Sequence, residues 1–284
     1  MKRIKTVLTI AGSDSCGGAG IQADIKTISS LGLYAASAIT AVTAQNTMGV
    51  RGIEAVSPAM LSAQIEAVLE DFDVKAVKTG MIYNSENVTA IKESLLKCNY
   101  QGPIVLDPVL VATSGDPLSS DNLINTMKTE LFPMATLITP NIPEAEALSG
   151  MEVKTLDDMR HAAKKIIADT GVKNVLVKGG HWSGEEMTDL LLSADGSEQL
   201  CTAPKIDTRN THGTGCTLSS AIASFLASGL ELPDAVQQAK TYVHNAISAA
   251  KDLETGHGHG SLNHLFHPNK MISIETTRSD VSSD

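Results

Sequence analysis

Aromatic residues are scarce in this sequence: Phe, Trp and Tyr together make up 3% of its 284 residues. Because the hydrophobic content is nevertheless 42%, the core must be built mainly from aliphatic side chains. A chain of this length can bury a large core, and one α/β domain of this size is more common than two small ones. We therefore expect a single domain over residues 1–284, with a frayed polar tail from about residue 279.

Cysteines are also few, and the four present show no CxxC pairing or regular spacing. This pattern suggests neither a zinc site nor a disulfide framework, and it fits a reducing compartment. The basic start of the chain is followed too soon by Gly12 and Asp14 for a signal peptide, and no apolar run is long enough to span a bilayer. We expect a cytoplasmic protein with no membrane partner.

Positive charge is in deficit, with a formal net charge of −10 at pH 7. Such a surface repels nucleic acids and anionic membranes, so neither is an expected partner. The two common nucleotide-binding patterns, GxGxxG and GxxxxGK[ST], are missing as well. A site that handles phosphate must therefore supply positive potential of its own.

Short apolar runs alternate with helical patterns along most of the chain. The runs predict strands near residues 7–11, 35–42, 74–79, 103–109, 135–138 and 175–177, and indicate a short further segment near residues 53–56. Alternation of this kind predicts an α/β fold with a mainly parallel sheet and helices on both faces. Segments near residues 188–193 and 198–203, joined by Asp195-Gly196, indicate a hairpin and hence an antiparallel edge.

Polar residues and glycines follow these predicted strands. In open α/β sheets ligands bind beyond the carboxyl ends of the strands. The residues at those ends include Gly12, Gln45, Met81, Asp107, Asn141, Glu144 and Lys178. Asp107 and Glu144 could hold Mg²⁺, and Lys178 could offset phosphate charge. Alternatively, the two carboxylates cap helices and Lys178 is a surface charge.

The stretch from Asn210 to Cys216 precedes an apolar helix. Gly213 and Gly215 flank Thr214 at the helix start, where free N–H groups and the helix dipole favour an anion. The same field would lower the pKa of the Cys216 thiol and favour thiolate. The stretch could equally be a tight turn with Cys216 as a small buried hydrophobe.

Asp24 falls on the apolar face of the first predicted helix, with Ile21, Ile25 and Ile28. An ionisable residue in this position needs a partner. The sequence leaves open whether that partner is a ligand or a buried salt bridge.

Five stretches together resemble the hydroxymethylpyrimidine/phosphomethylpyrimidine kinases of thiamine biosynthesis, a family of the ribokinase-like superfamily. They are AGSD and GGAGIQAD near the N-terminus, NIPE from Asn141, VKGGH from Val177 and THGTGCT from Thr211. The resemblance runs from about Lys5 to His267. It implies a three-layer α/β/α sandwich and a homodimer.

The same resemblance implies the reaction and its residues. ATP would phosphorylate the hydroxymethyl group of 4-amino-5-hydroxymethyl-2-methylpyrimidine, and then its monophosphate, in one site. The implied pyrimidine pocket comprises Gly12, Asp24, Gln45, Met81 and Val109. The implied anion hole is formed by Gly213, Thr214, Gly215 and Cys216. ATP phosphates would contact Asn141, Lys178 and Thr211, and Mg²⁺ would be held by Asp107 and Glu144.

Cys216 marks a departure from the ribokinase-like sugar kinases, which carry an Asp base at this position; the pyrimidine kinases share the Cys. We therefore expect Cys216 to be the base that accepts the hydroxyl proton, worth about 10²–10⁴-fold in rate.

Two alternatives remain at this stage. A pyridoxal or pyridoxine kinase, or an enzyme with both activities, would phosphorylate a hydroxymethyl group on a similar flat ring. Gln45 favours the aminopyrimidine, because an amide both donates to and accepts from the ring edge. A non-catalytic pyrimidine sensor on the same fold is the alternative from another class, although it would need neither metal nor base.

Overall fold

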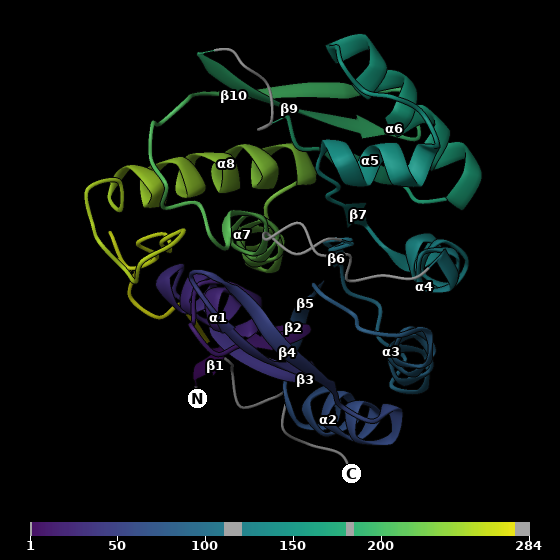
Figure 1. Cartoon of the computed structure of the whole chain (residues 1–284). Helices are drawn as coiled ribbons and strands as arrows, with labels where there is room; N and C mark the ends of the chain where they lie inside the picture. The colour runs from purple at the N-terminus through teal and green to yellow at the C-terminus, as the bar shows by residue number, and fades with distance from the viewer. Residues whose placement is uncertain (1, 111–120, 180–184, 276–284) are drawn as a thin grey trace.

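The computed structural model describes residues 2–110, 121–179 and 185–275 of the chain. Within them a nine-stranded sheet has the spatial order β10-β9-β8-β7-β6-β5-β2-β3-β4 (Figure 1). The bounds of the strands are Thr6–Asp14 (β2), Tyr34–Asn46 (β3), Gly49–Ala55 (β4), Val74–Thr79 (β5), Ile104–Leu106 (β6), Leu137–Ile138 (β7), Asn174–Val177 (β8), Glu186–Ser193 (β9) and Glu198–Pro204 (β10).

The centre of the sheet is parallel, as the apolar runs predict. The six strands from β8 to β3 pair in parallel, and residues 6–12 of β2 are all buried. Strands buried on both faces need near-continuous apolar sequence, which explains why the runs were visible. All six parallel strands end at the same edge of the sheet.

Both outer edges of the sheet are antiparallel. The predicted hairpin is confirmed as β9 and β10, and Gly196 in its turn has φ +89°. At the other edge β4 pairs antiparallel with β3. The sequence indicated only a short segment near residues 53–56 there, so the length and direction of β4 were missed.

Helices cover both faces of the sheet, which confirms the three-layer sandwich (Figure 1). One face carries α2 (Pro58–Asp71), α3 (Ser85–Lys97), α4 (Asp121–Thr126), α5 (Ile142–Ser149) and α6 (Leu156–Thr170). The chain continues from α4 through a π-helical turn (Met127–Leu131) and a 3-10 turn (Phe132–Met134). The other face carries α1 (Gly20–Ser30), α7 (Thr214–Ser228) and α8 (Leu232–Ser248).

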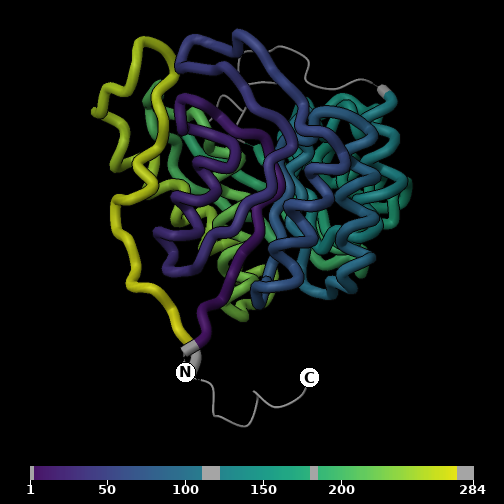
Figure 2. Tube along the Cα trace, turned by 90° about the horizontal axis from the view of Figure 1, so that it is seen from below, coloured from purple at the N-terminus to yellow at the C-terminus, as the bar shows by residue number. Residues whose placement is uncertain are grey.

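The C-terminal segment returns to the start of the chain. After α8 it runs along the outside of the molecule and ends beside the N-terminus (Figure 2). There β11 (Ser273–Glu275) pairs antiparallel with β1 (Lys2–Ile4), a pairing that the sequence analysis missed. The tail expected to fray from about residue 279 lies outside the described residues. Among the helices that the structure describes, none is long and apolar enough to cross a bilayer.

Candidate active site

Two cavities lie at the carboxyl ends of the parallel strands. The first, of about 400 Å³, contains Gln45 and is called the Gln45 cavity; the second, of about 370 Å³, contains Lys240 and is called the Lys240 cavity. Five residues line both: Asn141, Lys178, Thr211, Thr214 and Gly215. The two cavities therefore meet at the start of α7, where a chemical group could be transferred from a ligand in one cavity to a ligand in the other.

The Gln45 cavity brings together every residue that the sequence places in the site except Asp24. These lining residues are Gly12, Gln45, Met81, Asp107, Val109, Asn141, Glu144, Lys178, Thr211, Gly213, Thr214, Gly215 and Cys216. They lie at or just beyond the ends of the six parallel strands, or in the loop that leads into α7. The shared edge of the parallel strands thus explains why separate stretches of sequence meet here.

Asp24 requires a correction, because it does not line the cavity. Its carboxylate is fully buried and accepts hydrogen bonds from Lys78 Nζ at 2.8 and 2.9 Å. Thr9 Oγ1 and Ser220 Oγ each donate to it at 2.6 Å. Its oxygens are thus occupied by protein partners. Of the two possibilities that the sequence left open, the buried salt bridge is the one observed.

The start of α7 depends on glycine. Gly213 is the N-cap and has φ +86°, and a Cβ there would stand 1.8 Å from the carbonyl oxygen of Gly18. Only glycine combines this backbone conformation with such a close approach. First-turn N–H groups have no acceptor within their own helix, so those of Gly215 and Cys216 are available at the cavity that both residues line. A helix start of this kind favours an anion, so the arrangement is compatible with the anion hole that the sequence predicts.

Cys216 is a half-buried residue in this first turn, but the acidity of its thiol differs from the expectation. Burial raises the pKa of the thiol to about 11; Lys78 opposes the rise, while Asp24 and Asp107 add to it. The helix N-terminus alone predicts a lowered pKa, and that expectation was wrong. Cys216 carries its proton at neutral pH.

Asp107 and Lys178 form a close pair at the junction of the two cavities. Lys178 Nζ donates to Asp107 Oδ1 at 2.9 Å, and Thr139 Oγ1 donates to the same oxygen at 3.0 Å. Burial disfavours the ammonium, but Asp107 and Glu144 outweigh it and raise the pKa of Lys178. Lys178 is therefore a permanent cation beside the anion hole. A Cβ on Gly215 would lie 3.3 Å from both charged groups, so the glycine leaves this junction open.

Glu144 caps a helix and also lines the Gln45 cavity, so the capping interpretation does not exclude a place in the site. It forms a capping box with Asn141 at the start of α5, its carboxylate accepting the Asn141 N–H at 2.8 Å. It also lines the Gln45 cavity and is 4% exposed. Burial raises the pKa of Glu144 to about 7; Lys178 counteracts this and Asp107 reinforces it. The helix cap therefore positions the Glu144 carboxylate at the wall of the Gln45 cavity.

Asp107 and Glu144 also fit a hard cation. Both are nearly buried carboxylates whose charges repel each other, and Asp107 Oδ2 faces the junction beside Gly215. Mg²⁺ binds through one or two carboxylates together with substrate phosphates. These two residues therefore offer the oxygen ligands that such an ion requires.

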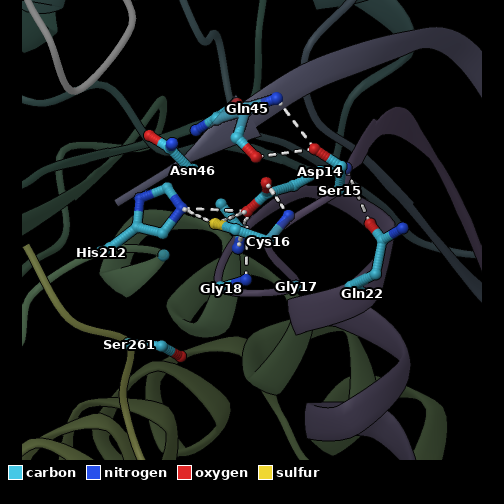
Figure 3. Close-up of polar contacts among 12 residues, drawn as sticks. Asp14, Ser15, Cys16, Gly17, Gly18, Gln22, Gln45, Asn46, His212 and Ser261 are labelled. Atoms are coloured by element: carbon cyan, nitrogen blue, oxygen red, sulfur yellow. Dashed lines mark hydrogen bonds and ion pairs between the residues drawn. The ribbon is translucent and has the colours of Figure 1, made fainter. Parts of the chain in front are cut away.

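Sequence reasoning missed Asp14 and His212, which also line the Gln45 cavity. His212 Nε2 lies 2.9 Å from Asp14 Oδ2, across a sequence separation of 198 residues (Figure 3). The N–H groups of Gly18 and Ala19 donate to the same carboxylate oxygen. Burial opposes the charge of Asp14, yet the hydrogen bonds from His212 and Ala19 hold its pKa well below the usual range. Asp14 stands at a strand end, and both residues belong to stretches that carry the family resemblance, AGSD and THGTGCT, but the sequence gives no sign that the two side chains meet.

The Lys240 cavity was missed as well. Its lining is largely apolar and includes Ile206, Leu218, Val243 and Ile247, with Asp189 and Lys240 as a polar pair. Lys240 Nζ donates to Asp189 Oδ2 at 2.7 Å, and both side chains are nearly buried. The sequence did carry a signal: Lys240 lies among the buried apolar residues of α8, just as Asp24 lies on the apolar face of α1.

Comparison with known proteins identifies the family of this chain. The sequence profile of the phosphomethylpyrimidine kinase family matches residues 14–263. A hydroxymethylpyrimidine/phosphomethylpyrimidine kinase of Rhizobium meliloti (strain 1021) is 50% identical over 260 residues, covering 92% of this chain and 96% of the relative. The match therefore spans nearly the whole of both proteins.

Solved structures share the fold. A phosphomethylpyrimidine kinase from Clostridium difficile 630 is 42% identical, covers 86% of this chain and 100% of its own, and has a TM-score of 0.75. A pyridoxal kinase from Staphylococcus aureus, in complex with AMP-PCP and pyridoxal, is 30% identical with a TM-score of 0.83 and covers 96% and 97% of the two chains. On the family match and these identities, the chain belongs to the phosphomethylpyrimidine kinase family.

Proposed function

We propose that this chain transfers the γ-phosphoryl group of ATP to the hydroxymethyl group of 4-amino-5-hydroxymethyl-2-methylpyrimidine, and then phosphorylates the monophosphate to the pyrophosphate. The observation that carries the proposal is the meeting of two cavities at one anion hole, beside the Lys178 ammonium. Phosphoryl transfer asks mainly for positioning and electrostatic stabilisation, and this junction offers both.

The Gln45 cavity is the proposed acceptor pocket. Met81 and Val109 supply apolar surface for a flat ring, and the Met81 methyl group packs closely on Gly12. The Gln45 side chain has both a donor and an acceptor for the amino and ring-nitrogen groups of the pyrimidine. Named pyrimidine kinases reach 42–50% identity with this chain, against 30% for the pyridoxal kinase described above, which favours the pyrimidine as acceptor.

The Lys240 cavity is the proposed nucleotide pocket. Its apolar wall between β10 and α8 suits a purine base, and its inner end opens on the shared residues at the start of α7. A phosphate chain lying there would reach Lys178, Asn141 and Thr211. The S. aureus relative binds AMP-PCP, which supports ATP as the donor here.

Around the transferring group the residues have separate tasks. The N–H groups of Gly215 and Cys216 hold its oxygens, and Lys178 offsets its charge. Asp107 and Glu144 would hold Mg²⁺, which when bound neutralises phosphate charge. Cys216 accepts the hydroxyl proton; with a resting pKa of about 11, this role requires the pKa to fall once the substrates are in place. A loose transition state helps, because it demands little from the base.

We also propose that the enzyme is a cytoplasmic homodimer. Val42 and Met48 on the β3–β4 edge are 51% and 69% exposed, and a subunit contact along this edge would cover both side chains. Light scattering coupled to size-exclusion chromatography measures the assembly directly, and a monomeric mass would contradict the proposal.

A kinase assay with three acceptors tests the main proposal. The chain is incubated with ATP, Mg²⁺ and either hydroxymethylpyrimidine, its monophosphate or pyridoxal, and ADP release gives kcat/KM for each. We expect the pyrimidine and its monophosphate to turn over, with the pyrimidine preferred over pyridoxal. Lys178→Met serves as the control, since it removes the cation at the junction. A higher kcat/KM with pyridoxal would favour the alternative kinase, and absence of turnover on every ring would favour the sensor.

A further inference from the structure

Asp14, Cys16 and His212 bring three different metal-ligating groups together at the rim of the Gln45 cavity (Figure 3). Asp14 is the last residue of β2, Cys16 belongs to the loop between β2 and α1, and His212 belongs to the loop before α7. Asp14 and His212 are nearly buried, whereas Cys16 is exposed. Two fixed ligands and one accessible thiol are thus arranged around one point.

The distances within this cluster are close to those of a zinc site. Cys16 Sγ lies 3.6 Å from His212 Nε2 and 3.3 Å from Asp14 Oδ2, and the remaining pair is 2.9 Å apart. Tetrahedral Zn²⁺ with bonds of about 2.3 Å to sulfur and about 2.0–2.2 Å to nitrogen and oxygen places its ligands roughly 3.4–3.6 Å apart. The three atoms therefore need to separate by only a few tenths of an ångström to admit the ion.

Both loops are shaped so that the imidazole reaches Asp14. A Cβ on Gly18 would lie 2.3 Å from His212 Cδ2, so only glycine leaves room for the ring. The Gly18 and Ala19 N–H groups hold Asp14 Oδ2 at 3.0 and 2.8 Å. Hydrogen bonds to a ligating carboxylate orient it toward a metal, as outer partners do in known sites.

The same geometry argues against a nucleophilic role for Cys16. In a thiol–imidazole–carboxylate triad the thiol and the carboxylate contact opposite ring nitrogens. Here Cys16 and Asp14 approach the same nitrogen, His212 Nε2. Convergence on one point is the arrangement of ligands around a cation.

We propose that Asp14 Oδ2, Cys16 Sγ and His212 Nε2 form a binding site for Zn²⁺, with water from the open side as the fourth ligand. The mixed oxygen, nitrogen and sulfur set favours zinc over Mg²⁺, which prefers oxygen alone. Binding releases the Cys16 thiol proton to solvent. It also requires the neutral His212 imidazole to carry its proton on Nδ1, so that Nε2 no longer donates to Asp14 and its lone pair binds the ion instead. The site joins the end of β2 and the β2–α1 loop to the loop before α7, at the rim of the Gln45 cavity, and its ligand geometry does not depend on which acceptor that cavity binds.

Titration of the full chain with Co²⁺ and then Zn²⁺ tests the site. The buffer contains excess Mg²⁺, to occupy the carboxylates of Asp107 and Glu144, and a reductant without thiols. We expect one equivalent of Co²⁺ with a thiolate charge-transfer band that Zn²⁺ displaces. Cys16→Ser should abolish the band and weaken Zn²⁺ binding by at least the roughly 10–100-fold that loss of an outer partner already costs.

Three further variants separate the outcomes. Cys98→Ser, at the end of α3, and Cys216→Ser should keep the band and the affinity. Cys16→His should lose the band but retain Zn²⁺ through its nitrogen, which shows that the loop stays folded. A band that survives in Cys16→Ser, or one that disappears in Cys216→Ser, would overturn the proposal by placing the ion elsewhere.

Discussion

His264 should make the stability of this protein depend on pH between about 4 and 6.5. The residue lies in the segment after α8, is 3% exposed, and its Nε2 stands 3.0 Å from Thr217 Oγ1 on α7. Tyr242 Oη donates to its carbonyl oxygen at 2.7 Å. Burial lowers the pKa of His264 from 6.5 to about 4, and the charge of Lys26 on α1 adds to the effect.

The sign follows from proton binding in the two states. At pH 5 the unfolded chain, with an ordinary imidazole, is mostly protonated at this residue, whereas the folded chain is mostly neutral. Because the unfolded state binds more protons, stability is full above pH 6.5 and falls as the pH drops toward 4. With values of 6.5 and about 4, lowering the pH from 7.5 to 5 removes about 2 kcal/mol.

Urea unfolding followed by circular dichroism at pH 7.5 and pH 5 measures this loss. Other groups titrate over the same range, so the informative quantity is the difference between wild type and His264→Gln, which carries no titratable group there. We expect wild type to lose about 2 kcal/mol more than the variant. Equal losses in the two proteins would refute the reasoning, since His264 would then titrate alike in both states.

Three substitutions test the site and its support. Cys216→Ala should lower kcat by about 10²–10⁴-fold if the residue is the proton acceptor; retention of more than roughly a tenth of the rate would contradict that role. Lys78→Met leaves the Asp24 carboxylate unpaired in the core and should cost about 3–5 kcal/mol in urea unfolding, while the double variant with Asp24→Asn should recover part of it. Gln45→Met should raise KM for the pyrimidine more than it lowers kcat, because it removes ring contacts and leaves the anion hole intact; steady-state kinetics would show a kcat effect alone if this reasoning fails.

Much of the fold and most of the cavity follow from local patterns. A strand buried on both faces has to be apolar throughout, so the β2 and β5 runs could be read directly. Parallel strands share one edge, and this rule was enough to bring Gln45, Asp107 and Lys178 together. The direction of β4 lacked such a signal, because its edge position leaves an irregular mixture of exposed and half-buried residues.

Features that depend on long-range contacts were out of reach. Periodicity places Asp24 on an apolar helix face, but its partner Lys78 comes from a strand 54 residues away. Cys216 shows the same limit: a helix start favours thiolate, yet the pKa depends on burial and on Asp24 and Asp107 nearby. Sequence spacing indicates which backbone groups lie next to a residue. The pKa of its side chain depends in addition on burial and on charged groups that the fold brings near from other parts of the chain.

The interlocked loops around Gly18 and Gly213 have a consequence for biosynthesis. The contact between Asp14 and His212 joins residues 198 positions apart, so a chain emerging from the ribosome can form β2, α1 and much of the sheet long before His212 is made. Domains begin to fold during synthesis, from the N-terminal side. The start of α7, with Gly215 and Cys216, is made later still, so a chain released before α7 should lack the proposed site of phosphoryl transfer and be inactive.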